Sequence, residues 1–249
     1  MVKPILEVVG LEKRFGALVV TDAVRFDLRA DECHALIGPN GAGKTTLVHQ
    51  ISGLLRPDAG TIHFAGRDIT RLPVHARARL GLARTFQITA IVPSLSALEN
   101  VALAVQRRVG SSFRFWGDAA HEPALNAPAL EALATVGLEA RTDVAAGSLA
   151  HGEKRALELA IALAMAPKAL LLDEPMAGVG HEEGRRLLDV LATVKRHVPL
   201  LLVEHDMHAV FSLADRISVL VYGRIIASGS PDAVRVDPEV RAAYLGEAA

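Results

Sequence analysis

One short segment of this chain has the residue types and the spacing that can hold a triphosphate. It matches G-x-x-x-x-G-K-[ST] and consists of Gly38, Pro39, Asn40, Gly41, Ala42, Gly43, Lys44 and Thr45. Glycines let the backbone curl with its N–H groups pointing inward, and a helix that follows adds the positive end of its dipole. Lys44 can reach the β- and γ-phosphates, and the Thr45 hydroxyl can bind Mg²⁺. The segment predicts a nucleoside triphosphate site.

The flanking residues supply the context that this motif needs. An apolar run from Cys33 to Ile37 precedes the loop and predicts a strand, whereas Thr46, Leu47 and Val48 begin a predicted helix. We therefore count Thr46 among the nucleotide-binding residues. A chance glycine-rich turn that carries a lysine is the alternative interpretation. The agreement of strand, loop and helix with the motif disfavours it.

A pair of acids follows a second predicted buried strand. Asp173 and Glu174 come directly after Leu170-Leu171-Leu172. At the carboxyl end of a strand, one carboxylate can hold Mg²⁺ through its water shell while the next orients or deprotonates the attacking water. Acids also end strands without any function. The phosphate-binding loop upstream favours the functional interpretation, with Asp173 as a metal residue and Glu174 as the catalytic base.

Composition limits the classes of protein to which the chain can belong. Its 249 residues, 51% of them hydrophobic, suffice for one large globular domain or two small ones. The formal net charge of −1 argues against nucleic acid as a partner. Cys33 is the only cysteine, which excludes an internal disulfide and fits a reducing compartment. No signal peptide or run of about 20 apolar residues occurs, so we expect any membrane role to come through a partner.

The remaining pattern predicts the elements that position these residues. Short alternating runs at Ile5–Val9, Val24–Leu28 and Thr61–Gly66 predict an antiparallel sheet, with a turn around Gly16. After Pro167, strands and helices alternate, which predicts a parallel sheet covered by helices. The helices expected in this part include Met207–Leu213, and Pro231–Leu245 is also expected to be helical. We therefore expect an α/β fold.

Between these two parts lies a stretch with helical periodicity. Ser96 and Glu99 form a predicted capping box, and helices are expected at Ala129–Val136 and Glu153–Met165. Gly110 to Pro128 is expected to be a loop, which carries Phe113, Phe115 and Trp116. The predicted domains are an ATP-binding core with an N-terminal β subdomain, residues 1–87 and 167–249, and a helical subdomain, residues 88–166.

The order of several motifs resembles one family. Asp173-Glu174-Pro175 after a leucine run is similar to the extended Walker B motif of ATP-binding cassette (ABC) ATPases. Phe15 falls where that family has its adenine-stacking aromatic, Gln87 matches its Q-loop, and His205 matches its switch histidine. The family's signature position is occupied by Leu149, Ala150, His151, Gly152 and Glu153.

This resemblance implies a P-loop NTPase (RecA-like) core, ATP and Mg²⁺ as cofactors, and ATP hydrolysis. Glu174, His205 and Gln87 would be catalytic, and Thr45, Gln87 and Asp173 would serve the metal. The signature residues Ala150, His151, Gly152 and Glu153 would contact ATP on the opposite subunit of a dimer. Without the family match, His205 and His208 could be interpreted as a metal pair, an alternative that the sequence disfavours because no cysteine and no second His pair lies nearby.

Three positions depart from the family pattern. Ala150 replaces the usual Ser and His151 the usual Gly, while Gly180 stands where Asp or Asn is usual in the D-loop. The missing hydroxyl removes one charge-assisted hydrogen bond, worth about 1–3 kcal/mol. The effect of these departures on turnover stays open, as does the role of the three loop aromatics.

Local features resemble the ATPases of branched-chain amino acid importers, among them Arg84-Thr85-Phe86-Gln87 and Met176-Ala177-Gly178-Val179. Relatives in that group are similar to uptake systems for urea or amides. The resemblance implies permease subunits, a second ATPase subunit (homodimer or paralogous heterodimer) and, indirectly, a substrate-binding protein. The chain would be peripheral, on the cytoplasmic face of the inner or plasma membrane. A groove from Gln87 to about Leu98 would receive a permease helix.

Three alternatives remain at this stage. A lipopolysaccharide export ATPase has a cassette of similar length and motifs. A soluble ABC ATPase acting on DNA or ribosomes usually has two cassettes or a long coiled-coil insert, neither of which occurs here. A GTPase or a small-molecule kinase is third, but the guanine motif Asn-Lys-x-Asp is absent. The transported substrate is not encoded in this chain.

Overall fold

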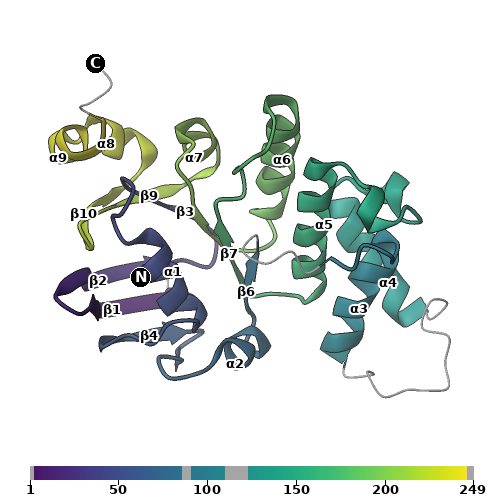
Figure 1. The fold of residues 1–249 in the computed structure, drawn as a ribbon, viewed down its shortest axis with the longest axis horizontal. Coiled ribbons are helices and arrows are strands. Elements are labelled where there is room, and N and C mark those ends of the chain that lie inside the picture. The colour runs from purple at the N-terminus through teal and green to yellow at the C-terminus, as the bar shows by residue number, and fades with distance from the viewer. Residues whose placement is uncertain (1–2, 86–90, 110–122, 246–249) are drawn as a thin grey trace. The chain divides into compact units, whose positions relative to one another are not determined.

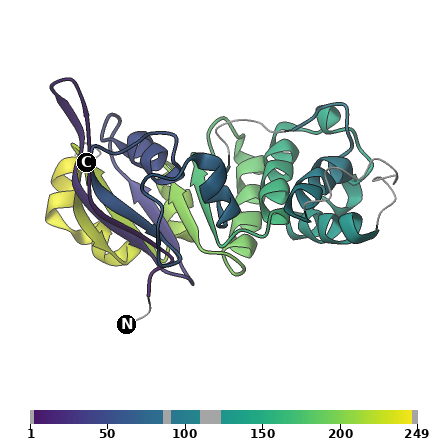
Figure 2. The same cartoon turned by 90° about the horizontal axis from the view of Figure 1, so that it is seen from below.

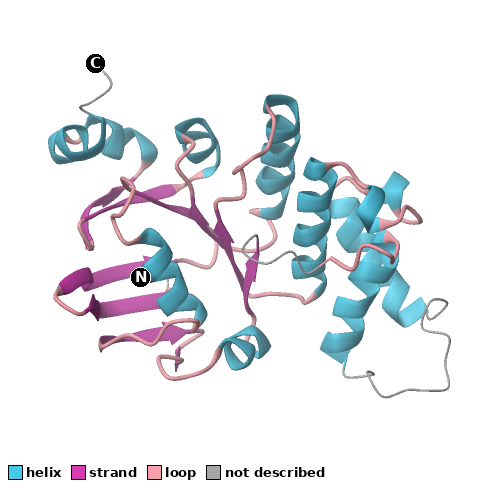
Figure 3. Ribbon diagram, viewed as in Figure 1, coloured by secondary structure: helices cyan, strands magenta, loops and turns pink. Residues whose placement is uncertain are grey.

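The computed structural model describes residues 3–85, 91–109 and 123–245. The chain divides into two compact units. The first unit contains Met1–Arg84, Lys168–Glu174 and Val198–Ala249, and the second contains Thr85–Pro167 and Pro175–His197. Figure 3 shows the strands of the first unit in magenta and the mainly helical second unit in cyan. The functional division at residues 88 and 166 stays a prediction.

A six-stranded sheet forms the centre of the first unit, in the order β10-β9-β3-β8-β7-β6. Neighbouring pairs among β3, β7, β8 and β9 are parallel, whereas β10 runs antiparallel to β9. This confirms the parallel sheet predicted from the alternating pattern. The strands are β3 (Cys33–Ile37), β6 (Leu82–Thr85), β7 (Ala169–Asp173), β8 (Leu200–Val203), β9 (Arg216–Val221) and β10 (Arg224–Gly229).

A second, antiparallel sheet has the order β2-β1-β4-β5. Its strands are β1 (Leu6–Phe15), β2 (Leu18–Leu28), β4 (Ala59–Phe64) and β5 (Arg67–Asp68). β1 and β2 are longer than predicted because irregularities in their pairing, such as the one between Val8 and Leu11, interrupt the alternation on which the prediction depended. The turn at Gly16 is confirmed, with a φ of 60°.

Helix α1 (Lys44–Ser52) lies between the two sheets of the first unit (Figure 1). Its Leu47, Val48 and Ile51 are fully buried in the hydrophobic core that both sheets line. Arg77, in α2 (Val74–Arg79), is 2% exposed and donates from Nη1 to the carbonyl oxygens of Gln50 and Ile51, 2.7 Å in each case. A cation placed on the last carbonyls of a helix stabilises that end, so Arg77 holds α1 in place behind the phosphate-binding loop.

The second unit contains α3 (Ala97–Val109), α4 (Pro123–Thr135), α5 (His151–Ala164) and α6 (His181–Val194), with 3₁₀ turns at Glu139–Arg141 and Ala146–Ser148. Helices α3, α4 and α5 pack side by side (Figures 1 and 2). The capping box of α3 is confirmed, because Ser96 N–H donates to Glu99 and Glu99 N–H donates to Ser96 Oγ.

One local prediction was wrong. The loop expected to run to Pro128 ends earlier, because α4 begins at Pro123 and contains Pro128. The stretch Pro231–Leu245 is helical as expected, but it is divided into α8 (Pro231–Val236), α9 (Pro238–Val240) and a π-helical turn (Arg241–Leu245). The break follows from Asp237, whose carboxylate caps α9 by accepting from two of its N–H groups.

The predicted helix at Met207–Leu213 is confirmed as α7. Phe113, Phe115 and Trp116 lie outside the described residues. Among the described helices, none combines the length and the apolar character that crossing a membrane would require.

Candidate functional site

The phosphate-binding loop joins β3 to α1 and approaches other backbone closely at two glycines. A Cβ on Gly38 would collide with the carbonyl oxygen of Leu220, and a Cβ on Gly43 would collide with that of Val20. Gly43 also has a φ of 104°, which side chains rarely allow. These positions therefore require glycine, and the loop can curl around a phosphate at the start of a helix.

Lys44 is the buried cation of this loop. Its Nζ donates to the carbonyl oxygens of Gly38, at 2.7 Å, and Pro39, at 3.1 Å. Burial lowers the pKa of Lys44, and the charges of Glu174 and Asp173 act in the opposite direction. The structure thus brings the predicted lysine within electrostatic range of both predicted acids. Thr45, the next residue, is exposed and available to a ligand.

The two acids follow β7 and differ in backbone conformation. Asp173 ends the strand, whereas Glu174 has a φ of 52°, in the left-handed region. Its N–H donates to the carbonyl oxygen of Val203 in β8, over 2.8 Å, which holds this conformation. Left-handed backbone costs a residue other than glycine about 1–3 kcal/mol and is concentrated at functional sites. The conformation supports a functional interpretation of Glu174.

Glu204 belongs to the site although sequence reasoning gave it no role. Its side chain is fully buried after β8, and its carboxylate accepts from the N–H groups of His205, at 2.9 Å, and Asp206, at 3.1 Å. The His205 side chain is 59% exposed, with its Nδ1 3.8 Å from the Glu204 carboxylate. The signal was available, because an acid directly after a four-residue apolar strand is placed at the same sheet edge as Asp173.

Arg84 is the second residue to which sequence reasoning gave no role. It lies in β6, and its guanidinium forms an ion pair with Asp173. Gln87 lies outside the described residues. Among the described residues, no group of three His, Cys, Asp or Glu side chains is arranged to hold a metal ion, and His208 stands in the first turn of α7.

The residues of the first unit fit Mg²⁺ with a nucleotide. Mg²⁺ prefers oxygen ligands, of which a few come from protein and the others from water and phosphate. The Asp173 carboxylate and the Thr45 hydroxyl supply such oxygens, while the glycine cradle and Lys44 suit the phosphates. When bound, Mg²⁺ would neutralise charge on the phosphates.

Phe15 ends β1 beside the hairpin turn and pairs with Leu18. Its side chain is 51% exposed, and the ammonium of Lys13 lies 5.7 Å from the ring centroid. Half-exposed aromatic rings have a face available for stacking on a base. Its position is compatible with the role that the family resemblance implies.

The signature segment lies in the second unit, at the start of α5. Ala150 occupies the N-cap position and supplies no side-chain cap. Glu153 accepts from the Ala150 N–H and from Arg141 Nε, 2.9 Å in both cases. The hydrogen bond from the Ala150 N–H lowers the pKa of Glu153. Half of a capping box therefore survives without the hydroxyl, and the helix dipole remains.

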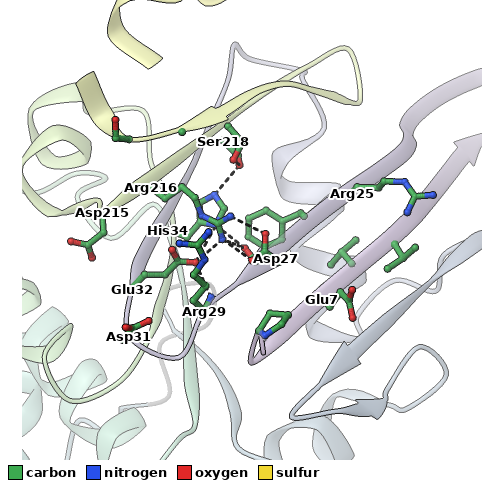
Figure 4. A pocket seen from close by; sticks show the side chains of 17 residues that line it. Glu7, Arg25, Asp27, Arg29, Asp31, Glu32, His34, Asp215, Arg216 and Ser218 are labelled. Carbon is green, nitrogen blue, oxygen red and sulfur yellow. Dashed lines mark hydrogen bonds and ion pairs between the residues drawn. The ribbon is translucent and has the colours of Figure 1, made fainter. Parts of the chain in front are cut away.

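A polar cavity of about 1040 Å³ in the first unit contains none of these residues. Figure 4 shows His34 between Asp27 and Ser218, with Arg216 beside them. His34 Nδ1 lies 2.7 Å from the Asp27 carbonyl oxygen, and Nε2 lies 2.8 Å from Ser218 Oγ. Burial, with the nearby charge of Arg216, lowers the pKa of His34 to about 3. The neutral ring therefore donates from Nδ1 and accepts at Nε2, so these buried groups satisfy one another.

Comparisons with known proteins identify the family of this chain. Residues 21–177 match the family model of the ABC transporter, and residues 224–249 match that of the branched-chain amino acid ATP-binding cassette transporter. The high-affinity branched-chain amino acid transport ATP-binding protein BraF of Pseudomonas aeruginosa is 38% identical over 100% of both chains. The lipopolysaccharide export system ATP-binding protein LptB of Acidithiobacillus ferridurans is 36% identical, over 98% of this chain and 97% of its own.

Among solved structures, the ADP conformation of MJ1267, an ATP-binding cassette of an ABC transporter, superposes with a TM-score of 0.83. It is 28% identical and covers 98% of this chain and 99% of its own. The P-loop fold and the family resemblance are thereby confirmed. The chain belongs to the ABC transporter family and, as a member, is an ATP-hydrolysing subunit of a transporter.

Proposed function

We propose that this chain powers the import of branched-chain or related amino acids, with urea or amides as the alternative substrates. The observation that carries this proposal is the full-length similarity to BraF, at 38% identity, together with the match of residues 224–249 to the branched-chain amino acid model. Lipopolysaccharide export is the second candidate, supported by the 36% identity to LptB.

An uptake assay separates these candidates. Deletion of the gene should abolish high-affinity uptake of labelled leucine, isoleucine and valine, and a plasmid copy should restore it. Lys44→Ala serves as the matched negative control, since it removes the phosphate-binding ammonium at one position. Normal uptake of all three amino acids, urea and amides in the deletion strain would contradict the import proposal. Loss of surface lipopolysaccharide would support the export ATPase.

In the proposed mechanism, residues of this chain bind the triphosphate, orient the attacking water and neutralise charge on the phosphates. Lys44 exchanges its bonds to Gly38 and Pro39 for bonds to phosphate oxygens. Asp173 and Thr45, with Gln87, would hold Mg²⁺, which would neutralise charge on the phosphates. Glu174 takes a proton from the attacking water, and His205 donates a hydrogen bond to the γ-phosphate.

Docking to a permease is proposed for an apolar groove in the second unit. The groove has a volume of about 200 Å³, and its apolar floor includes Leu95, Leu98 and Leu103, of which Leu103 is 47% exposed. Glu99 and Gln106 supply polar groups at its rim. An apolar groove with a polar rim suits an amphipathic helix, here a short cytoplasmic helix of the permease. The chain would thus sit at the cytoplasmic face of the membrane as one of two ATPase subunits.

Cysteine cross-linking tests the groove. In the assembled transporter, Leu103→Cys and Gln106→Cys, both in the lining of the groove, should capture a permease subunit. Leu130→Cys is the matched control, because Leu130 has a similar exposed fraction, 44%, lies in the same unit and does not line the groove. Equal capture at Leu130, or none at the two groove positions, would show that the permease docks elsewhere.

A further inference from the structure

We propose that Arg84 is a positioning residue for Asp173 and sets the Mg²⁺ dependence of nucleotide binding. Its Nη2 donates to Asp173 Oδ2 over 2.6 Å, the length of a strong charge-assisted hydrogen bond. Only 12% of the Arg84 side chain and 10% of the Asp173 side chain are exposed. An ion pair with so little solvent is screened weakly, in contrast to a surface pair.

The surroundings of the guanidinium fix its position. Nη1 donates to Ser52 Oγ, at 3.3 Å, in the last turn of α1, the helix that follows the phosphate-binding loop. The buried Nε has no hydrogen-bond partner among the described residues. Arg84 therefore forms its strongest described contact with the carboxylate of Asp173, and the other end of its fork reaches the nucleotide-binding helix.

The position of the Arg84 cation beside Asp173 affects how a triphosphate would bind. The Asp173 carboxylate, which Arg84 contacts, ends β7 and lies within electrostatic range of Lys44, the cation expected to bind the phosphates. A triphosphate without metal would be repelled by an unpaired carboxylate there. The Arg84 cation offsets that repulsion, and it also competes with Mg²⁺ for the same carboxylate.

Removal of this charge should therefore affect two binding reactions differently. Nucleotide without metal should bind more weakly, because the Asp173 charge is no longer neutralised. Nucleotide with Mg²⁺ should bind about as well as before, because the metal replaces the missing cation. A residue with a merely structural role would weaken both reactions by the same factor.

The test compares the dissociation constant of a fluorescent ADP analogue in EDTA with that in excess Mg²⁺. We define the ratio as the dissociation constant in EDTA divided by that in Mg²⁺. In Arg84→Gln, this ratio should rise about tenfold, as expected for the loss of one partly buried charge. Arg84→Lys keeps the charge at the same position, so its ratio should stay within about twofold of the wild type. Thermal unfolding establishes that each variant is folded. If the Gln variant unfolds, the same ratio is measured in Arg84→Met, an apolar replacement of similar length, and the same rise is expected.

The inference rests on the proposed role of Asp173 in holding Mg²⁺. One further variant, Asp173→Asn, distinguishes a failure of that role from a failure of the inference about Arg84. If Asp173→Asn leaves the wild-type ratio unchanged, Asp173 does not hold Mg²⁺ and the proposed metal site fails. If Asp173→Asn lowers the ratio while Arg84→Gln shifts both constants equally, the metal site stands and the role of Arg84 is overturned. A raised ratio in Arg84→Gln that disappears in the double variant with Asp173→Asn supports the inference.

Discussion

The carboxylate of Glu204, buried without any exposed surface, accepts a hydrogen bond from the backbone N–H of His205 over 2.9 Å. The same oxygen also accepts from the N–H of Asp206. Two bonds from successive amides to one ion fix the path of the chain where β8 ends. The exposed imidazole of His205 is therefore attached to backbone that these hydrogen bonds hold in place.

Glu204→Gln should lower both stability and ATPase activity. A carboxamide oxygen can still accept both bonds, but it lacks the charge that strengthens them, and an NH₂ group replaces the second buried oxygen, so we expect a loss of about 1–3 kcal/mol in the free energy of unfolding. The ATPase rate should fall without a comparable change in nucleotide affinity. Steady-state kinetics of Glu204→Gln, His205→Ala and the double variant measure the coupling. Fully additive effects would show that Glu204 does not act through His205.

Phe15→Ala should weaken ATP binding by about 1–3 kcal/mol, the value of stacking between a base and an aromatic ring. ATP should be preferred only modestly over GTP, since stacking tolerates either base. Leu18→Ala is the matched control, because Leu18 pairs with Phe15 in the hairpin and is 65% exposed. A titration with fluorescent nucleotide measures both variants, and an unchanged affinity in Phe15→Ala would refute base stacking.

Glu174→Gln should nearly abolish hydrolysis while ATP and Mg²⁺ still bind. Intact ATP would then accumulate between two subunits and stabilise a dimer by mass action. Light scattering should show a shift from monomer to dimer with ATP and Mg²⁺, reversed by chelation of the metal. Hydrolysis at the wild-type rate would exclude Glu174 as the base. An inactive variant that stays monomeric would keep the catalytic role and would indicate that closure needs the permease.

Ala150→Ser restores the hydroxyl that the signature lacks. The N-cap position of α5 already has backbone donors and the Glu153 half of a capping box, so the ATPase rate should stay unchanged or rise modestly. The Ser hydroxyl should also cap the helix and raise the free energy of unfolding by about 1 kcal/mol. A large fall in rate, measured by phosphate release, would mean that His151 or its loop performs the task of the usual Ser.

Acid should destabilise the fold through His34. Its pKa is about 3 in the folded state and 6.5 in the unfolded chain, so the unfolded state binds a proton that the folded state does not. The free energy of unfolding should therefore fall as the pH drops from 6.5 toward 3, by about 1.4 kcal/mol per pH unit. Urea unfolding at several pH values measures this slope, and His34→Gln should remove the contribution of His34 while the contribution of carboxylates such as Asp27 and Glu153 remains. Equal slopes in the two proteins between pH 6 and pH 4 would contradict the assignment.

The neighbouring carboxylate does not obscure that measurement. Burial would raise the pKa of Asp27, but the hydrogen bond and the charge of Arg216 outweigh it and lower the pKa below its usual value. Asp27 thus stays ionised over most of the range in which the unfolded His34 titrates.

Sequence alone predicted those parts of the site that local pattern determines. The loop from Gly38 to Thr45 and the acids after β7 depend on contiguous residues, so strand, loop and helix could be assigned without tertiary contacts. The ion pair between Arg84 and Asp173 joins residues 89 positions apart, and no local periodicity indicates which side chains will meet across neighbouring strands. The buried state of Glu204 likewise depends on what covers it.

Tertiary contacts also explain where the observed elements differ from those predicted from the sequence. Bulges in β1 shift the alternation of apolar and polar side chains, so the strand continues beyond the residue at which that alternation ends. The loop was expected to run to Pro128, but packing among α3, α4 and α5 retains this residue inside α4. Tertiary contacts decided both cases, against the local preference of the residues.

The left-handed backbone at Glu174 has a consequence for how this position varies. Gly or Asn adopts that conformation at lower cost than Glu, so either replacement should relieve part of the backbone strain at the proposed catalytic base. A laboratory selection for thermostability alone would therefore favour replacement of this glutamate, and a selection that also demands ATP turnover should retain it.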